Sequence, residues 1–400
     1  MNPRPSLVFV CDTAPDSRAP HHHMAAAWLS RGAQVLCVCP APAGQAEARS
    51  FGTPLGPVPA RFIPLPGRGA WGKLAWQLGL ALRLAVLRLR APRGTLFMVQ
   101  GHVACPAAWA ALAGLPPGRV IYQTQNYLEP GRHRLWAFFE RRLARRAGTV
   151  LCNEVNRGRF MASHYGLDRP PLTLPTALPK AWLPAPKPGA ARRARGLRRL
   201  GLPSDPGLRL VLHQGSYAPE RCGDQILEAL SLLPKRYHLA YTGCRPGPRL
   251  DAATRAVASR PALGGRVHFL PELPFADLLA ATPLFDLGLL LYPNDGVGNF
   301  YQAPGRLTEY VGSGLAVVAS RFPGLELLLL KHGLGETCDP ESPRDIARAI
   351  GALGRPGRAA AGHRRLRLRR VFEEALCYDA GAAVLEGALA GAGAKGRPWN

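Results

Sequence analysis

Lysine and acidic residues are scarce in this sequence of 400 residues. Only six of its 51 basic residues are lysine, 26 residues are acidic, and the formal net charge is +25. Such a charge favours an acidic partner, such as a nucleotide phosphate, a lipid phosphate, nucleic acid or an anionic membrane surface. The alternative is genome composition, because a GC-rich genome produces an arginine excess without selection for any ligand. Aromatic residues do not interleave with the arginine clusters as stacking platforms require, so nucleic acid is not expected as a partner.

Paired cysteines, long apolar segments and a leader-like N-terminus are also missing. The nine cysteines are scattered and form no CxxC pair, which predicts buried free thiols in a reducing compartment rather than a disulfide framework or a zinc site. The sequence has no stretch of about 18 uncharged apolar residues, so no transmembrane helix is expected. The first residues lack the apolar region and cleavage site of a signal peptide. We expect a cytoplasmic protein, and the alternative is a peripheral protein at the inner face of the membrane.

Short apolar segments alternate with helical patterns along the chain, which predicts parallel, doubly wound sheets. In the first half we expect strands at Leu7–Cys11, Gln34–Cys39, Thr95–Gln100, Arg119–Gln123 and Thr149–Cys152, and helices at Pro20–Arg31, 104–114, 131–146 and 156–165. In the second half we expect strands at Leu208–His213, His238–Thr242, Arg266–Leu270, Phe285–Leu291 and Leu315–Ala319, and helices at 222–233, 274–281, 304–313 and 343–354.

Two α/β domains of similar size follow from this alternation. The expected divisions are a first domain at 1–180, a linker rich in proline and arginine at 181–203, a second domain at 204–375, and a C-terminal helix and tail at 376–400. Open parallel sheets bind ligands outside the carboxyl ends of their strands. We therefore expect the two domains to face a central cleft.

The segment from Asn299 to Ser320 carries the clearest chemical pattern. A loop enters a helix near Pro304, a residue favoured in the first turn, and Arg306 lies beside backbone amides that have no helical partner. A helix start and a forked guanidinium together would bind an anion. Glu309 lies three residues on, near Arg306 on one helix face, and its carboxylate suits hydrogen bonds to sugar hydroxyls. The alternative is a surface ion pair between these two side chains.

This segment resembles the nucleotide-sugar glycosyltransferases of the GT-B fold, most closely the large retaining family of bacterial cell-surface polysaccharide enzymes. The pattern stands here as Pro304-Gly-Arg-Leu-Thr-Glu-Tyr310, followed by Gly314-Leu-Ala-Val-Val-Ala-Ser320. The resemblance implies the α/β GT-B fold, with two doubly wound Rossmann-like domains that face a central cleft. The first domain would take the acceptor and the second the nucleotide sugar.

The resemblance also assigns donor-binding residues. It implies that Glu309 holds the ribose of the donor, that Arg306 approaches its diphosphate, and that Asn299, Phe300 and Tyr301 contribute to the donor loop. Tyr301 stands where the family has a second glutamate.

Two further segments of the second half match the family. The segment His213–Gly223 looks like its glycine turn followed by a basic residue, which places Gly215 and Ser216 beside the donor phosphates and Arg221 against them. Leu270 ends a strand that resembles the one lying against the base, and either Leu270 or Pro271 stands where the family has its usual glycine.

The first half matches less specifically. Asp16 and Arg18 resemble an Asp-x-Arg turn on the acceptor side, and His102 follows a strand as the family's cleft histidine does. Gln125 lies in an acceptor-side segment of amides and hydroxyls, where the family often carries Asp, His and Glu. The alternative for each residue is a helix cap or a polar loop position. Three adjacent histidines, His21–His23, cannot easily face one ion, so no metal site is expected there.

Gly72–Arg90 has Trp76, Leu80, Leu84 and Leu87 on one stripe and several cations. One interpretation is a core helix of the first domain. The other is a partly exposed face that touches anionic lipid, as a lipid-linked acceptor would require.

The function that the resemblance implies is hexose transfer from a nucleotide diphosphate sugar to a glycan or lipid-linked acceptor in cell-surface polysaccharide synthesis. The leaving diphosphate gains charge as the glycosidic bond breaks, so Arg221 and Arg306 would stabilise it, with His102 as the third catalytic candidate. No DxD element is present, and no metal or cofactor is expected besides the donor substrate. Without an evident carboxylate nucleophile, retention would proceed on the face of the leaving phosphate. The alternatives are a degenerate GT-B protein that binds nucleotide or glycan, and a nucleotide-sugar epimerase on the same fold.

Overall fold

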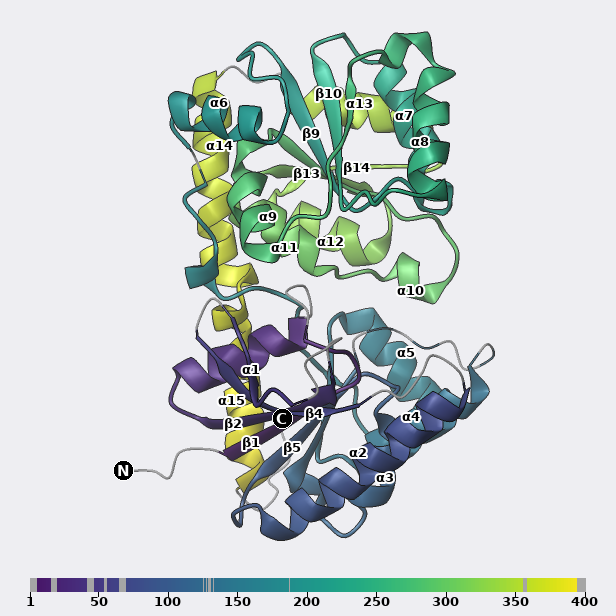
Figure 1. The fold of residues 1–400 in the computed structure, drawn as a ribbon, viewed down its shortest axis with the longest axis vertical. Coiled ribbons are helices and arrows are strands. Elements are labelled where there is room, and N and C mark those ends of the chain that lie inside the picture. The colour runs from purple at the N-terminus through teal and green to yellow at the C-terminus, as the bar shows by residue number, and fades with distance from the viewer. Residues whose placement is uncertain are drawn as a thin grey trace. The chain divides into compact units, whose positions relative to one another are not determined.

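The computed structural model describes residues 6–15, 20–41, 47–53, 56–64, 70–124, 126, 128, 131, 133–186, 188–354 and 358–393. The chain divides into two compact units (Figure 1). The first unit combines Met1–Thr176 with Gly381–Asn400, and the second is Ala177–Ala380. Each unit is described by itself below.

The first unit is built on an eight-stranded sheet with the order β3-β4-β2-β1-β5-β6-β7-β8. Its neighbours are parallel except β3 and β4. The strands are β1 (Ser6–Cys11), β2 (Gln34–Pro40), β3 (Ser50–Phe51), β4 (Val58–Ile63), β5 (Leu96–Gln100), β6 (Val120–Gln123), β7 (Thr149–Cys152) and β8 (Leu172–Thr173). The helices are α1 (Pro20–Ser30), α2 (Ala70–Arg90), α3 (Cys105–Ala111), α4 (Arg134–Arg146), α5 (Val155–Tyr165) and α15 (Tyr378–Gly393).

Helix α2 packs on this sheet through the stripe that the sequence indicated. Trp76, Leu80 and Leu84 are buried in the core with Phe97 and Val99 of β5. The interpretation of this segment as a core helix is therefore confirmed, because its 3.6-residue apolar period faces the sheet.

The second unit is built on a six-stranded parallel sheet with the order β11-β10-β9-β12-β13-β14. The strands are β9 (Arg209–Gln214), β10 (Tyr237–Thr242), β11 (Val267–Phe269), β12 (Leu287–Leu290), β13 (Ala316–Ser320) and β14 (Gly335–Cys338). The helices are α6 (Ala190–Arg199), α7 (Gly223–Ser231), α8 (Pro248–Ala258), α9 (Phe275–Ala281), α10 (Val297–Phe300), α11 (Gly305–Gly312), α12 (Pro323–His332), α13 (Pro343–Gly354) and α14 (Arg358–Val371). Strands β9, β12 and β13 are almost wholly buried, as expected for a parallel sheet covered on both faces.

Every strand expected from the sequence forms within two residues of its expected bounds. The segment 181–203, expected to be a linker, packs on the second unit instead. Its helix α6 buries Leu197 and pairs Arg193 with Asp286, so the proline-rich stretch leads directly into a packed element. All nine cysteines are free and buried, which confirms the prediction of buried thiols. Within the described residues, no helix combines the length and apolar character that crossing a bilayer requires.

Candidate functional site

The strand order of the second sheet changes direction between β9 and β12. β9 continues through α7 to β10 on one side, whereas β11 leads through α9 back to β12 on the other side. Such a switch point leaves a crevice outside the carboxyl ends of the two strands, which is where open α/β sheets bind ligands. Gln214 is the last residue of β9, and Tyr292 follows the end of β12. The candidate site is built around these two strand ends.

Arg306 spans both strand ends from the first turn of α11. Its Nη1 donates to the backbone oxygen of Gln214, and its Nη2 donates to the Tyr292 hydroxyl at 2.7 Å. Burial acts against the charge of Arg306, but the nearby hydroxyls of Tyr292 and Tyr310 outweigh it, so the pKa of the guanidinium is raised. Arg306 is therefore a fixed cation at the switch point. Its contact with a diphosphate stays a prediction.

Tyr292 is held in turn by the last residue of β13. Its backbone N–H donates to the Ser320 hydroxyl at 2.8 Å, and this hydroxyl donates to the Tyr292 carbonyl at 3.0 Å. Sequence reasoning missed Tyr292, although its place at the end of a buried apolar strand was a usable signal. The final serine of the Gly314–Ser320 motif thus fixes the residue that positions Arg306.

Gly215 lies against the Arg306 guanidinium. Its φ of +137° is a conformation that side chains rarely adopt, and an added Cβ would lie 3.6 Å from Arg306 Nη1 and 3.5 Å from the His213 ring. Burial and the positive charge of Arg306 lower the pKa of His213 to about 3. His213 therefore stays neutral, and its Nδ1 donates to the Gly215 carbonyl at 3.3 Å. Ser216 follows in the same turn and is half-buried.

Tyr310 closes the floor beneath this turn. Its hydroxyl accepts a hydrogen bond from the Gln214 amide at 2.8 Å and donates to the Leu212 carbonyl at 3.3 Å. Gly288 makes room for the Tyr310 ring, since a Cβ there would overlap it. The side-chain Oε1 of the buried Gln214 has no hydrogen-bond partner in the described part of the chain. The two hydrogen bonds of Tyr310 thus hold the end of β9, just before the glycine turn. The unpaired Oε1 of Gln214 lies at the same strand end.

Arg221 lies at the end of a short 3₁₀ turn, Pro219–Arg221, just before α7. Its side chain is exposed, and none of the described residues forms a hydrogen bond or ion pair with it. The positive charge of Arg221 contributes to the lowered pKa of His213, as that of Arg306 does. Arg221 therefore lies near His213. The next residue, Cys222, has φ +61° and is the one non-glycine residue with positive φ among those described. This strained turn places the exposed, unpaired guanidinium of Arg221 near the switch point.

The remaining candidate donor-binding residues differ in burial and in the hydrogen bonds that they already make. Glu309 is half-buried in α11, and its charge acts on Arg306 and Tyr310. Leu270 is buried, and its N–H and carbonyl both pair within the unit, with Tyr241 and Cys244. The backbone N–H of Leu270 is therefore already used, and its buried side chain offers an apolar contact.

Asn299, Phe300 and Tyr301 form the end of α10 and the residue after it, and all three are half-buried. Asn299 Oδ1 accepts a hydrogen bond from Gln302 at 3.0 Å, while the Phe300 ring packs edge-on against Tyr301 at 5.2 Å. Gly324 lets the start of α12 approach this loop, because a Cβ there would overlap the backbone of Tyr301 and Gln302. The loop is thus braced from behind, and its role in donor binding stays a prediction.

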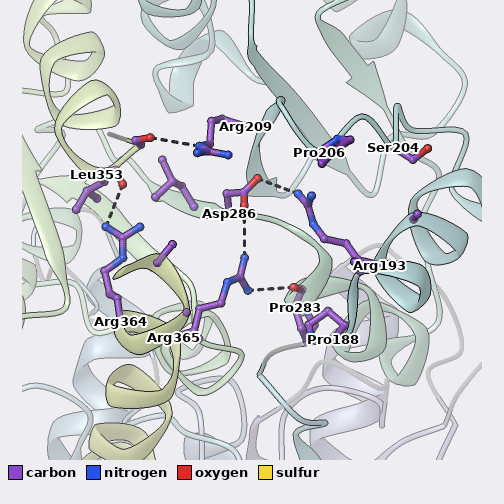
Figure 2. Close-up of a pocket in the computed structure, with 17 residues that line it drawn as sticks. Pro188, Arg193, Ser204, Pro206, Arg209, Pro283, Asp286, Leu353, Arg364 and Arg365 are labelled. Carbon is purple, nitrogen blue, oxygen red and sulfur yellow. Dashed lines mark hydrogen bonds and ion pairs between the residues drawn. The ribbon is translucent and has the colours of Figure 1, made fainter. Parts of the chain in front are cut away.

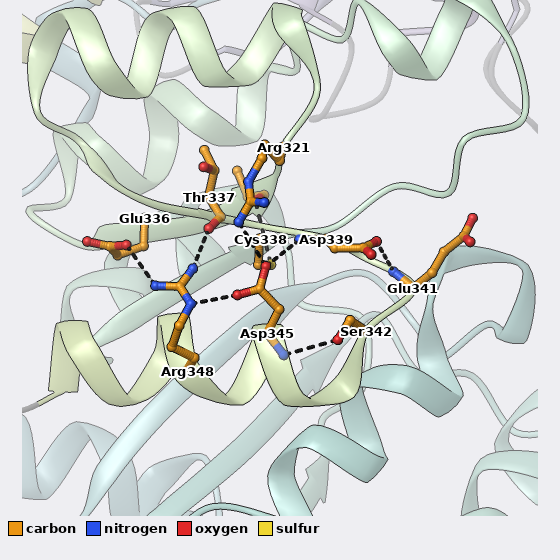
Figure 3. A network of polar contacts seen from close by, with 10 residues as sticks. Arg321, Glu336, Thr337, Cys338, Asp339, Glu341, Ser342, Asp345 and Arg348 are labelled. Atoms are coloured by element: carbon orange, nitrogen blue, oxygen red, sulfur yellow. Dashed lines mark hydrogen bonds and ion pairs between the residues drawn. The ribbon is translucent and has the colours of Figure 1, made fainter.

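A polar network fixes the next loop along the same sheet edge (Figure 3). Asp345 accepts hydrogen bonds from Arg321 and from the Asp339 amide, each at 2.9 Å, and from Arg348 at 2.5 Å. Burial alone would raise the pKa of Asp345, but these donors outweigh it and hold that pKa below its usual value. The network joins the ends of β13 and β14 to the start of α13.

The first unit has its own switch point, between β1 and β5. Asp12 follows β1, and His102 follows β5 by two residues. Gly101, with φ +84°, has no side chain where the Asp12 carboxylate lies, and Asp12 Oδ2 accepts the Val103 amide at 3.2 Å. Burial raises the pKa of Asp12 to about 6, and burial with the charge of His133 lowers the pKa of His102. Sequence reasoning found His102 and missed Asp12, which adjoins it only through the pairing of β1 with β5.

Three acceptor-side candidates, Asp16, Arg18 and Gln125, lie outside the described residues. The side chains of His21–His23 lie outside them as well. Of the acceptor-side predictions, only the neighbourhood of His102 can therefore be followed in the structure.

Comparison with solved structures identifies the architecture. HepE of Anabaena, in complex with UDP and glucose, is 15% identical with a TM-score of 0.72 over 96% of this chain and 99% of its own. A glycosyltransferase from Rickettsia africae is 10% identical, with a TM-score of 0.73 over 98% and 100%. Sucrose-phosphate synthase from Thermosynechococcus elongatus is 14% identical, with a TM-score of 0.70 over 96% and 99%.

The chain has the GT-B fold. The fold class that the sequence predicted is confirmed by this likeness. No protein-family model matches the sequence, and no curated protein matches it either. At these identities the likeness concerns the fold, so the activity has to be argued from the residues of the site.

Proposed function

We propose that this GT-B chain is a glycosyltransferase whose donor is a nucleotide diphosphate sugar. The observation that supports it best is Arg306, a cation fixed at the switch point by Gln214 and Tyr292. Beside it lie the glycine turn at Gly215 and the exposed side chain of Arg221, which has no hydrogen bond or ion pair with the described residues. This combination suits a ligand with two adjacent phosphates better than a neutral ligand.

The chemistry follows from where charge develops. As the bond between the sugar and the diphosphate breaks, negative charge builds on the leaving phosphate oxygen. Arg306 and Arg221 would stabilise that charge, and a preorganised donor is worth about 3 kcal/mol in such a position. His213 would not share this role, because its pKa of about 3 keeps the ring neutral. We propose that the reaction needs no metal, since these two cations supply the positive charge.

We further propose that the anomeric configuration is retained, with the acceptor hydroxyl attacking on the face of the leaving phosphate. Glu309 would accept hydrogen bonds from the ribose hydroxyls of the donor. HepE is described with UDP and UDP-glucose, which supports a UDP-hexose as the first donor to test.

The acceptor is proposed to bind at the carboxyl edge of the first unit. His102 and Asp12 lie at its switch point, and the raised pKa of Asp12 leaves a carboxylate that can accept a hydroxyl proton near neutral pH. We propose a glycan or lipid-linked acceptor and a place in cell-surface polysaccharide synthesis.

An exposed apolar stripe on α2 supports an acceptor at a membrane surface. Opposite its buried face, α2 exposes Trp71 and Leu89, each 83% accessible, with four apolar residues between them at helical spacing. Those four are Leu74, Leu78, Leu82 and Val86. The exposed cations Lys73, Arg83 and Arg90 accompany the stripe. We propose that this face lies on anionic lipid at the cytoplasmic side of a membrane, as amphipathic basic helices do.

Incubation with a panel of nucleotide sugars tests the proposed activity. Release of a nucleoside diphosphate, faster with an extract of lipid-linked glycans than with water alone, is the expected result in the presence of EDTA. If no donor in the panel is turned over although one of them binds, the chain is a binding protein rather than a transferase.

A further inference from the structure

A cavity of about 270 Å³ lies in the second unit at the amino edge of its sheet (Figure 2). Arg209 is the first residue of β9, Leu287 is the first residue of β12, and Gly314 precedes β13; all three line the cavity. Because the strands are parallel, Gln214 and Tyr292 mark the opposite, carboxyl edge. The cavity is therefore separate from the donor site around Arg306.

The lining of this cavity carries an excess of positive charge. Four arginines reach it, from α6, β9 and α14, against a single carboxylate, Asp286. The four are Arg193, Arg209, Arg364 and Arg365. Figure 2 shows them arranged around Asp286. One carboxylate cannot neutralise four guanidinium groups.

Asp286 is already fully engaged by two of the arginines and the backbone. Its Oδ2 accepts hydrogen bonds at 2.9 Å from Arg193 Nη2 and from the Leu210 amide, and its Oδ1 lies 3.7 Å from Arg365 Nη2. Arg365 also donates to the carbonyls of Pro283 and Phe285. Arg193 and Arg365 are therefore structural, since they fasten α6 and α14 to the start of β12.

Arg209 and Arg364 are each held by one hydrogen bond to a backbone carbonyl, and neither forms an ion pair with a carboxylate of the described residues. Arg209 Nε donates to the Gly354 carbonyl at 3.2 Å, and Arg364 Nη1 donates to the Leu353 carbonyl at 2.9 Å. Within the described part of the chain, both terminal nitrogens of Arg209 and the Nε and Nη2 of Arg364 have no further partner. The end of α13 thus orients both guanidinium groups and leaves several donors for a ligand.

The crowding of like charges shows what kind of ligand would be favourable. Burial, and then the neighbouring cations Arg367 and Arg209, lower the pKa of Arg364 despite the charge of Asp286. Burial, with Arg193 and Arg364, likewise lowers the pKa of Arg365. An oxyanion would relieve this repulsion and accept the unused N–H groups in a forked geometry.

We propose that this cavity is a second anion site, which binds the phosphate monoester group of a small molecule through Arg209 and Arg364. The cavity has room for a phosphate with a small attached group, since one water molecule occupies about 30 Å³ in the liquid. The N-terminus of α6, which begins at the cavity wall with Ala190, adds partial positive charge. The site does not depend on the proposed transferase activity, because none of its residues belongs to the donor site.

Calorimetric titration of the full chain with inorganic phosphate and with a hexose monophosphate tests this proposal. Ionic strength is held constant with chloride. Arg209→Gln and Arg364→Gln should each weaken phosphate binding about tenfold or more, because a charge-assisted hydrogen bond is lost. Arg370→Gln is the matched control, since Arg370 lies on the same helix, is exposed and does not line the cavity. Arg306→Gln changes the proposed donor site and should leave phosphate binding at the cavity of Arg209 and Arg364 unchanged.

Folding of each variant is checked by circular dichroism without phosphate, and two independent arginines are tested in case one substitution alters the fold. Vesicles with and without phosphatidic acid distinguish the source of the phosphate group. Binding to vesicles that contain phosphatidic acid, without binding of soluble phosphate and with loss of vesicle binding in Arg364→Gln, would assign the site to a lipid headgroup rather than to a soluble ligand. Equal phosphate affinity in the parent, Arg209→Gln and Arg364→Gln, or the absence of binding in every arm, would overturn the proposal and leave these arginines a purely structural role.

Discussion

Arg306 donates a hydrogen bond of 2.7 Å to the hydroxyl of Tyr292, and this contact joins the first turn of α11 to the end of β12. The same guanidinium reaches the end of β9 through the carbonyl of Gln214. A lysine would present a single nitrogen with freely rotating N–H groups, whereas the planar guanidinium directs two separate nitrogens at these two acceptors. The fork of Arg306 is therefore what fixes a cation between the two strands.

Replacement of this fork tests the phosphate site. Arg306→Lys keeps the charge and Arg306→Ala removes it, and Arg221→Ala removes the second cation. Each alanine variant should lower kcat/KM for the donor about tenfold to a hundredfold, since a charge-assisted contact is worth roughly 1.5–3 kcal/mol. Arg306→Lys should also lose activity, by a smaller factor. Arg370→Ala serves as the control, and kinetics unchanged in both Arg306→Ala and Arg221→Ala would remove the proposed site.

The role of Glu309 is tested by a double change in enzyme and donor. Glu309→Gln keeps size and one acceptor but loses the charge, while a 2′-deoxyribose donor loses a hydroxyl. If the Glu309 carboxylate contacts the ribose hydroxyl, the two changes have non-additive effects. The variant then loses discrimination between the two donors by a factor of about ten or less. A surface ion pair instead predicts a small loss of stability with full discrimination. Strict additivity would therefore withdraw Glu309 from the ribose.

His213 makes stability depend on pH in a defined direction. Its pKa is about 3 in the folded chain and about 6.5 in the unfolded chain, so only the unfolded chain takes up a proton between these values. His213 leaves the free energy of unfolding unaffected above about pH 6.5. Below that pH the free energy of unfolding falls by up to about 1.4 kcal/mol for each pH unit. The His213→Gln variant lacks this dependence of stability on pH. Urea unfolding at pH 7.5 and pH 5 should show the parent losing more stability than the variant, and an equal loss in both would contradict the buried neutral ring.

Much of this fold was predictable, and the reason is local. Buried strands such as Leu208–His213 are marked by continuous apolar runs, and the helix start at Arg306 is marked by its own turn residues. Strands β3, β4, β8 and β14 were missed: β3 and β8 are two residues long, β4 contains a proline, and β14 has no run of apolar residues. The helices α8, α10, α12 and α14 were missed as well.

The parts of the site that escaped prediction are those assembled by topology. Tyr292 and Gln214 meet Arg306 only because β9 and β12 are neighbours in the sheet. Asp12 and Gly101 adjoin only through the register of β1 with β5. The α2 helix is apolar on two faces, so its periodicity left open whether the side opposite Trp76 is exposed.

Gly101→Ala tests the arrangement of Asp12 in the first unit. The new Cβ would overlap the Asp12 carboxylate, and φ +84° would be strained for alanine, so a loss of about 1–3 kcal/mol in stability is expected. Gly52→Ala is the control, since nothing lies within 4 Å of a Cβ there. Thermal unfolding measures both variants, and a Gly101→Ala protein as stable as the control would show that Asp12 lies elsewhere.

The exposed stripe of α2 is tested with vesicles. The parent should pellet with anionic vesicles at low salt and less at high salt, and only weakly with neutral vesicles. The double variant Leu78→Ser and Leu82→Ser should pellet less, whereas Leu172→Ser, an exposed apolar residue outside α2, should behave like the parent. Equal binding to neutral and anionic vesicles would leave genome composition as the explanation of the net charge.

The most direct test of the central claim is calorimetric titration of the full chain with UDP, UDP-glucose and other nucleoside diphosphates, in EDTA, beside the Arg306→Gln variant. The account predicts saturable binding of at least one nucleoside diphosphate by the parent, weakened about tenfold or more in Arg306→Gln, with phosphate binding at the Arg209 and Arg364 cavity unaffected. Binding of equal strength in the parent and in Arg306→Gln, or no binding of any nucleoside diphosphate, would contradict it.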